Sequence, residues 1–450
     1  MTTTSLSMIR HTIAFVFLTA LLTFILLNSC QREENAISQK YKPSYYSSDV
    51  LDKWMTMQLR LMRNSTGIAN HAFSRHFAYA GVAAFESLRP GLHGQPLQWS
   101  DKWNSLTGLP VVNHSKKYYY PANVNAAMAA FNKAMFPNAS AADKTAIDSL
   151  EAALNQEFLN DQPESLITTS SNFGKAVATA IFTWAETDGY KNANSPYTIP
   201  TGAGLWKPTA PAFANPATPY WGNNRTIIAG STSNSQPGSP LPYSTDPASS
   251  FYAMVKEVYD ASLVLTNDQK AMAMFWRDIP GVSSPGHWLS ILQQVVKQSG
   301  ASLEKAALAY AFTGTAINDA LIACFEAKYA YNLVRPITYI REVMGHTTWN
   351  SFLGTPAHPE YLSAHSSLSI AAARVIEKIF GNIGSFTDNT YDYLGFAPRT
   401  YPSIIAIGVE AGRSRFYAGI HYNNTIDAGI LQGNKIAENI FETIGNQNSK

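Results

Sequence analysis

The chain has 450 residues, with 33 lysines and arginines against 31 aspartates and glutamates and a formal net charge of +2 at pH 7. Only 14% of the residues are charged, whereas binding to a nucleic-acid backbone needs a large, clustered basic surface. This composition excludes nucleic acid as a partner. Two cysteines cannot build a disulfide framework, so stability must come from a core, and a chain of this length can bury one.

The first 29 residues have the pattern of a lipoprotein signal peptide. A polar start is followed by an apolar run over residues 12–27 and then by Leu-Asn-Ser-Cys, which ends at Cys30. Such a segment is a targeting element, and the pattern predicts cleavage before Cys30 with lipid attached to its thiol. The alternative is an ordinary transmembrane anchor. We therefore expect an exported cell-envelope lipoprotein, on the periplasmic or outer-surface side, that touches the membrane only through its lipid.

After a tether over residues 30–48, apolar residues recur at helical spacing, and the alternation typical of strands is nearly absent. The N-terminal helical part, residues 49–190, has predicted helices at 49–63, 70–88, 122–136, 140–159 and 173–187. Residues 191–249 are rich in Pro, Gly, Ser, Thr and Asn, which predicts a long loop insert. The aromatic residues Trp206 and Trp221 indicate a loop packed onto the body.

The C-terminal part, residues 250–450, returns to helical periodicity. Its predicted helices lie at 251–265, 267–277, 288–298, 303–334, 366–380 and 401–417. No repeat period or heptad pattern is present. The sequence therefore predicts an all-α, single-domain protein built from packed helical bundles, with the functional site in its C-terminal part.

Three segments contain candidate functional residues, and the first of them contains two cationic side chains. Lys328 and Arg335 are seven residues apart, close to two helical turns, which predicts that both project from one face of a helix ended by Pro336. A solvated basic stripe is the alternative. The neighbouring residues are largely apolar, and this favours a buried pair that binds an anion.

The second and third segments add imidazoles and another arginine. Ser363, Ala364 and His365 precede a predicted helix, whose free N–H groups and dipole favour an anion. Ser363 could instead be only an N-cap. Arg415 and His421 flank a stretch where Gly419 could end the helix and let the imidazole turn back toward the arginine. Together the three segments predict a single oxyanion site.

These segments resemble the signature of the type-2 phosphatidic acid phosphatase and vanadium-dependent haloperoxidase superfamily, which reads Lys-x6-Arg-Pro, then Pro-Ser-Gly-His, then Ser-Arg-x5-His-x3-Asp. The chain departs from it in three places, with Leu362 for the proline, Ala364 for the glycine and Thr425 for the aspartate. Ala364 still offers a backbone N–H. The aspartate normally orients the second histidine, and here the next carboxylate along the chain is Asp427.

Other stretches are similar to the haloperoxidase branch, and they extend the resemblance over most of the mature chain. They are Trp-Lys-Pro-Thr at 206–209, Pro-Tyr-Trp-Gly at 219–222, Phe-Trp-Arg-Asp-Ile-Pro-Gly at 275–281 and Pro-Gly-His-Trp at 285–288. The resemblance implies a helical-bundle haloperoxidase fold and a vanadate cofactor. It also implies oxidation of a halide by hydrogen peroxide to hypohalous acid, with iodide or bromide as the expected halide.

The resemblance also implies residue roles. Vanadate oxygens would be held by Lys328, Arg335, Ser363, Ala364 and Arg415, and the lysine and arginines would stabilise negative charge as the O–O bond breaks. The vanadium would be bonded by His421, and His365 would be the acid–base group. Phe325 is a candidate for the halide side of the pocket, with a core aromatic as the alternative.

Two other functions stay open at this point. Vanadate has the shape of a phosphoryl-transfer transition state, so the same residues could form a metal-free acid phosphatase with His421 as the phosphorylated nucleophile. A non-catalytic, phosphate-binding envelope lipoprotein is the third possibility. Three further histidines, His76, His287 and His358, are expected to be structural, and His358 is the best placed of them to support the site.

Overall fold

The computed structural model describes residues 42–92, 101–279 and 283–444, and Cys30 and the predicted signal peptide lie outside them. Helices dominate, which confirms the all-α prediction, and the described strands form a single antiparallel hairpin. The helices are α2 (Asp49–Asn64), α3 (Phe73–Glu86), α5 (Tyr120–Met135), α6 (Ala141–Phe158), α7 (Glu164–Ala185), α8 (Ser250–Leu263), α9 (Asn267–Phe275), α10 (Ser284–Ser299), α11 (Leu303–Tyr331), α12 (Pro336–Glu342), α13 (Ala364–Phe380), α14 (Ile404–Tyr417) and α15 (Asn423–Ile444), and the hairpin pairs β1 (Phe386–Asp388) with β2 (Arg399–Tyr401).

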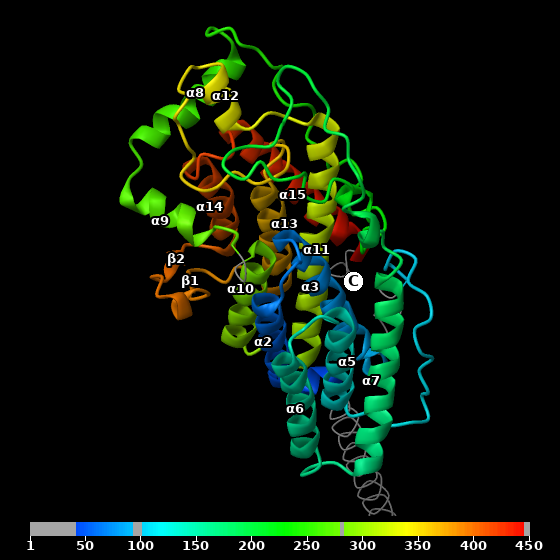
Figure 1. Cartoon of the computed structure of the whole chain (residues 1–450). Helices are drawn as coiled ribbons and strands as arrows, with labels where there is room; N and C mark the ends of the chain where they lie inside the picture. Colours follow the sequence, from blue (N-terminus) through cyan, green and yellow to red (C-terminus); the bar gives the residue numbers. More distant parts are fainter. Residues whose placement is uncertain (1–41, 93–100, 280–282, 445–450) are drawn as a thin grey trace, which may run out of the picture.

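Helix α11 is the central element of the molecule. It packs against α3 of the N-terminal bundle and against α13 of the C-terminal one, and Figure 1 shows it running between the two groups of helices. A helix that is apolar on all faces belongs in a core. Among the described residues it is the one helix long and apolar enough to cross a membrane, yet 94% of that apolar stretch is buried within the protein.

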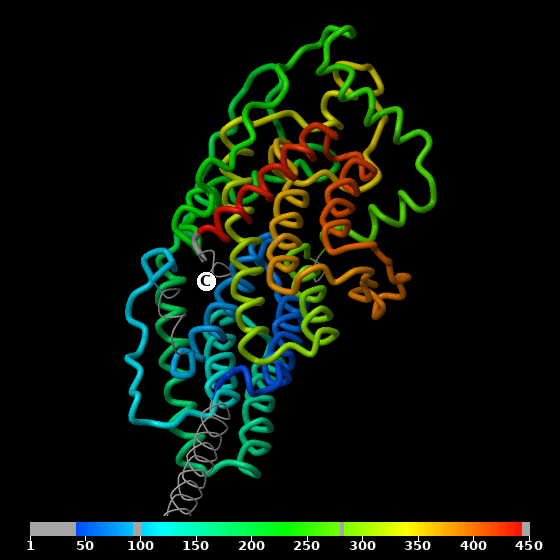
Figure 2. Tube along the Cα trace, turned by 180° about the vertical axis from the view of Figure 1, so that it is seen from behind, coloured from blue at the N-terminus to red at the C-terminus, as the bar shows by residue number. Residues whose placement is uncertain are grey.

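Helix α13 is wedged between α14 and α15 at a spacing that two glycines permit; the three helices lie together in Figure 2. A Cβ at Gly412 of α14 would lie 2.7 Å from Ser366 Oγ, and one at Gly429 of α15 would lie 2.7 Å from the carbonyl oxygen of Ser363. Both contacts are shorter than van der Waals packing allows. Gly412 therefore lets the start of α13 sit directly against α14, and Gly429 lets it sit directly against α15.

Gly429→Ala should lower the free energy of unfolding by about 1–3 kcal/mol, the usual result of overpacking a tight core, because the added methyl meets a backbone atom that cannot rotate away. Urea denaturation measures this change. Gly354→Ala is the control, since a Cβ there meets no atom within 4 Å. Equal denaturation midpoints for the two variants would contradict the tight contact between α13 and α15.

The long loop is packed onto the body, as predicted. It has no regular element other than the short turns η4 (Tyr190–Asn192) and η5 (Trp221–Asn223). Both Trp206 and Trp221 are buried. Asp319, from the middle of α11, accepts hydrogen bonds from the backbone N–H of Ile227 (2.8 Å) and from the Ser231 hydroxyl (2.7 Å). A buried carboxylate with several donors thus fastens the loop to the central helix.

Some element boundaries differ from the prediction. Helix α7 begins at Glu164, nine residues before the predicted start, because the run Thr-Thr-Ser-Ser-Asn in its first half hides the helical period. Helix α14 begins at Ile404, since residues 399–401 form β2. The prediction also missed α15, although its apolar residues recur at helical spacing. This helix contacts the site through Thr425, which donates to Glu360.

Candidate active site

A cavity of about 540 Å³ lies at the N-terminal end of α13. The predicted site residues that line it are Phe325, Ala364, His365, Arg415 and His421. Further parts of the wall come from elsewhere in the chain, and include His71 from the N-terminal region and Arg277, Asp278 and Ser284 around the start of α10. Both halves of the chain therefore contribute to one cavity.

Lys328 and Arg335 reach the site from two elements, and the prediction that they share one helix face is wrong. Helix α11 ends at Tyr331, and Asn332 follows in the left-handed region with φ of 47°, a common way to end a helix. Pro336 does not end that helix. It stands in the first turn of α12, where its missing N–H is no loss, and Arg335 is the N-cap of that helix.

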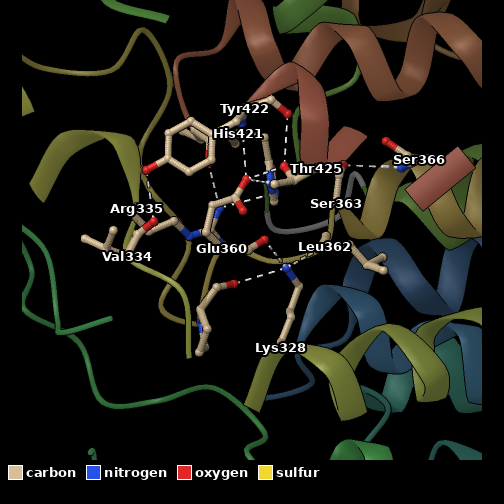
Figure 3. Close-up of polar contacts among 12 residues, drawn as sticks. Lys328, Val334, Arg335, Glu360, Leu362, Ser363, Ser366, His421, Tyr422 and Thr425 are labelled. Carbon is tan, nitrogen blue, oxygen red and sulfur yellow. Dashed lines mark hydrogen bonds and ion pairs between the residues drawn. The ribbon is translucent and has the colours of Figure 1, made fainter. Parts of the chain in front are cut away.

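Lys328 is fully buried and holds the segment that precedes α13. Its Nζ donates to the carbonyl oxygens of Pro359 (3.1 Å), Glu360 (2.9 Å) and Leu362 (2.6 Å), as Figure 3 shows. Burial lowers the pKa of Lys328 to about 8. The lysine lies behind the cavity wall rather than in it, and it fixes the backbone on which Ser363 follows.

Arg335 is also fully buried and makes contact with the second histidine of the signature. Its Nη1 donates to the Ile420 carbonyl oxygen (2.8 Å) and to His421 Nε2 (3.2 Å), and its Nη2 lies 2.9 Å from His358 Nδ1. His358 thus supports the site through Arg335. Burial lowers the pKa of the Arg335 guanidinium to about 10.

Arg415 projects from the last turn of α14 into the cavity wall and is 2% exposed. Its Nε donates to Ser414 Oγ (3.0 Å) and its Nη2 to the Ala273 carbonyl oxygen (2.9 Å), which fixes the plane of the guanidinium. Burial lowers the pKa of Arg415 to about 10, and the nearby carboxylate of Asp278 opposes that shift.

We call Lys328, Arg335 and Arg415 the cation cluster. Two carboxylates, Glu360 and Asp278, act on these three charges. Buried cations need counter-charge, so the site has the composition that suits an oxyanion. Within the described ranges no group of three or more His, Cys, Asp or Glu side chains could hold a metal cation directly. Vanadate, which is an oxyanion, fits this donor set.

The triplet that begins with Ser363 lies at a helix N-terminus, as predicted. Ser363 is the N-cap of α13, with its Oγ accepting from the Ser366 N–H, and its own N–H donates to the Thr425 carbonyl oxygen (3.2 Å). Ala364 starts the helix and lines the cavity. The backbone amides at this end can therefore face an anion.

His365 is held from one side, which settles its tautomer. Its Nε2 lies 2.9 Å from the Trp276 carbonyl oxygen and 2.8 Å from Ser284 Oγ. A carbonyl can only accept, so Nε2 carries the hydrogen and Nδ1 is the basic atom of the neutral ring. Burial, and then the charge of Arg415, lower the pKa of His365 well below its usual value. The ring is therefore neutral near physiological pH.

His421 follows the end of α14, where Gly419 has φ of 74° and allows the chain to turn, as predicted. The arginine that its imidazole contacts is Arg335, whereas the expected partner was Arg415. Burial lowers the pKa of His421 well below its usual value, and the charges of Arg335 and Lys328 lower it further. This imidazole is also neutral.

Sequence reasoning missed Glu360, which is fully buried at the site. Its Oε1 accepts from His421 Nδ1 (2.6 Å), from Thr425 Oγ1 (2.6 Å) and from the Tyr422 N–H (3.2 Å). Burial raises its pKa to about 6. Asp427 instead forms an ion pair with Arg413 at the surface (2.5 Å). The available signal was an acidic residue in a short apolar stretch just before the second motif.

Asp278 and His71 were also missed. The Asp278 carboxylate accepts from the Ser284 hydroxyl (2.9 Å), next to His365, and burial raises its pKa. His71 contacts Phe325 with ring centroids 4.5 Å apart and ring planes tilted by 31°, and burial together with the Lys328 charge lowers the pKa of His71 to about 3. Phe325 lies between His71 and His358 and is 1% exposed, so it is both a core aromatic and part of the cavity wall.

The chain is similar to known proteins. Residues 308–449 match the VCPO second helical-bundle domain. The chain is 29% identical to a bacterial vanadium-dependent iodoperoxidase, over 88% of this chain and 96% of that one, with a TM-score of 0.77. A holo-type bacterial vanadium-dependent chloroperoxidase has the same fold, at 18% identity, with 85% of this chain and 93% of that one covered and a TM-score of 0.64. No curated protein matches the sequence. The fold, the cation cluster with its two histidines and these similarities together support a member of the vanadium-dependent haloperoxidase family.

Proposed function

We propose that this haloperoxidase uses vanadate and hydrogen peroxide to oxidise iodide or bromide to hypohalous acid. The observation that carries the proposal is the buried cation cluster around His421, whose Nε2 faces Arg335. A guanidinium can only donate a hydrogen bond, so Nε2 must offer its lone pair. An unprotonated imidazole nitrogen set among buried positive charges is suited to bond the metal of an oxyanion, which would take the place of the Arg335 hydrogen bond at Nε2.

In this proposal His421 would bond the vanadium, and Arg415 and the start of α13, at Ser363 and Ala364, would hold the vanadate oxygens. Lys328 and Arg335 lie behind the cavity wall, and would act on the oxyanion through their charge and by fixing the backbone around it. Bound vanadate supplies Lewis-acid activation of hydrogen peroxide, so that an oxygen atom can pass to the halide. The protein supplies fixed, buried positive charge where negative charge would develop as the O–O bond breaks.

His365 provides the proton transfers. Its neutral ring accepts a proton from hydrogen peroxide at Nδ1 and returns one to the oxygen that leaves as water. The Trp276 carbonyl oxygen holds Nε2–H, so the ring keeps its orientation while Nδ1 changes its protonation. Asp278 and Ser284 lie on the far side of the ring from that nitrogen and stabilise the imidazolium when it forms.

Two observations support iodide or bromide as the halide. Chloride is the hardest of the three to oxidise and requires the most positive site, and here the carboxylates of Glu360 and Asp278 offset part of the cation cluster. The similarity at 29% identity is to an iodoperoxidase. The aromatic wall of His71, Phe325 and His358 is the proposed halide side of the cavity, since polarisable rings suit a large, weakly hydrated anion.

We also propose that the mature chain is an envelope lipoprotein, exported and anchored through lipid on Cys30. The support is the signal-peptide pattern of residues 1–29. Hydrogen peroxide and halide would then be drawn from outside the cytoplasmic membrane.

The purified chain should oxidise iodide and bromide with hydrogen peroxide only after orthovanadate is added, because the activation step depends on the cofactor. Halide oxidation is measured before and after removal of vanadate by chelator and dialysis, with aryl-phosphate hydrolysis followed on the vanadate-free sample. Phosphate hydrolysis that vanadate inhibits, without any halide oxidation, would assign the site to the acid phosphatase. The absence of activity in both assays would favour a non-catalytic, phosphate-binding protein.

A further inference from the structure

The carboxylate that contacts His421 comes from a different position in this chain than in the family signature. The resemblance places an aspartate at position 425, where this chain has threonine. Glu360, on the segment between α12 and α13, extends its side chain to that place, and its Oε1 accepts both His421 Nδ1 and Thr425 Oγ1 at 2.6 Å. Figure 3 shows Glu360 between Arg335 on one side and His421, Tyr422 and Thr425 on the other.

Two neighbours fix the same tautomer of His421. The Glu360 carboxylate, which can only accept, faces Nδ1, and the Arg335 guanidinium, which can only donate, faces Nε2 at 3.2 Å. The hydrogen of the neutral ring therefore lies on Nδ1, and the lone pair on Nε2. A hydrogen bond from the far nitrogen to a carboxylate also holds the ring plane and increases the basicity of the ligating nitrogen.

The backbone around Glu360 is held by Lys328, a member of the cation cluster. Lys328 Nζ donates to the carbonyl oxygen of Glu360 and to those of both Pro359 and Leu362. The Glu360 N–H donates to the Leu333 carbonyl oxygen (3.0 Å). A glutamate has one more rotatable bond than an aspartate, and these backbone contacts reduce the freedom that its longer side chain brings.

We propose that Glu360 is the positioning residue for His421, and that Glu360 and Thr425 are an exchanged pair: the carboxylate now comes from the segment before α13, and position 425 has become a hydroxyl that donates to it. The inference rests on the proposed function, because positioning matters when His421 bonds vanadium. It makes position 360 a determinant of vanadate affinity in this chain.

The test is a double-mutant cycle on positions 360 and 425, with the orthovanadate dissociation constant measured by calorimetry and the thermal midpoint measured in parallel. Glu360→Ala should weaken orthovanadate binding about 10–100-fold, the usual loss when the partner of a metal-binding histidine is removed. Thr425→Asp alone should also weaken it, because two carboxylates would then meet in a buried space. The double variant returns one carboxylate and should bind more tightly than either single variant.

Rescue in the double variant is the decisive result. Independent losses that add in the double variant would overturn the inference, and so would rescue of the thermal midpoint without rescue of orthovanadate affinity, since that would make Glu360 merely structural. If the alanine variant does not fold, Glu360→Leu takes its place, because it fills a similar volume but offers no acceptor to His421 Nδ1. Unchanged affinity in that variant would overturn the inference too.

Asp427→Ala is the matched control. This carboxylate lies on the same helix as Thr425 and is 57% exposed in its ion pair with Arg413, so its removal should leave orthovanadate binding unchanged. Failure of the proposed function gives a different result. Wild-type protein that neither binds orthovanadate nor oxidises halide would overturn that function, whereas wild-type protein that does both, with an additive cycle, would overturn only the role of Glu360.

Discussion

Arg415→Ala should lower vanadate-dependent halide oxidation by about 10²–10³-fold, the usual result of removing one preorganised donor from a site where negative charge develops. The guanidinium is held by Ser414 and by the Ala273 carbonyl oxygen. Because it is already in place, no free energy is spent on reorienting it in the transition state. It is also the member of the cation cluster that lines the cavity. The change is read from kcat/KM for iodide at saturating orthovanadate.

Arg413→Ala is the control for this prediction. Arg413 lies two residues earlier on α14, is 36% exposed and pairs with Asp427, so its loss should change activity little. Arg415→Lys keeps the charge but not the planar fork, and its activity should lie between those of wild type and the alanine variant. If halide oxidation survives Arg415→Ala undiminished, the oxyanion site has been assigned to the wrong residues.

His365→Ala should lower kcat by about 10²–10⁴-fold, the range that a positioned acid–base group contributes, and should leave orthovanadate affinity nearly unchanged. The reason is the separation of the two imidazoles. His421 has its Nε2 beside Arg335 and is the proposed ligand of the metal, while His365 has its Nε2 held by Trp276 and Ser284 and keeps Nδ1 for the proposed proton transfer. Steady-state rates and orthovanadate calorimetry on the same preparation measure the two effects.

Ser284→Ala serves for comparison, because it removes the hydroxyl between His365 and Asp278 but keeps the histidine. Its kcat should fall much less than that of the alanine variant at 365. Loss of orthovanadate binding in His365→Ala, at unchanged thermal midpoint, would show that His365 is a ligand of the cofactor and not the proton-transfer group.

The parts of the fold that follow from local periodicity were predictable from the sequence. Helices α2, α6 and α13 agree with their predicted ranges within a few residues, because their apolar positions recur regularly and their starts carry a clear signal, such as the Ser140 N-cap. Helix α15 was missed although its apolar positions recur at helical spacing. What the sequence could not show is why it contains Gly429, since the reason is the close contact with α13, which is a tertiary property.

Most residues of the site were predictable from the sequence, but the way in which the backbone brings them together was not. The three motif segments named most of the cavity residues, yet Lys328 and Arg335 come together through a left-handed Asn332 and a new helix, which seven-residue spacing cannot distinguish from one continuous helix. Glu360 could not be found because its partner, His421, is 61 residues away in sequence. A carboxylate that acts across such a distance has no local pattern.

Helix α11 belongs to both helical bundles, and this limits how far the C-terminal bundle can be separated from the rest of the protein. The stretch that matches a known domain begins at residue 308, inside this helix, and the same helix packs against α3 of the N-terminal bundle. The C-terminal bundle is therefore not an independent folding unit that could be moved into another protein. Transplanted without α3, it would expose one whole side of its own central helix to water, and the residue at the end of that helix, Lys328, would lose the rigid support from which it clamps the active-site backbone.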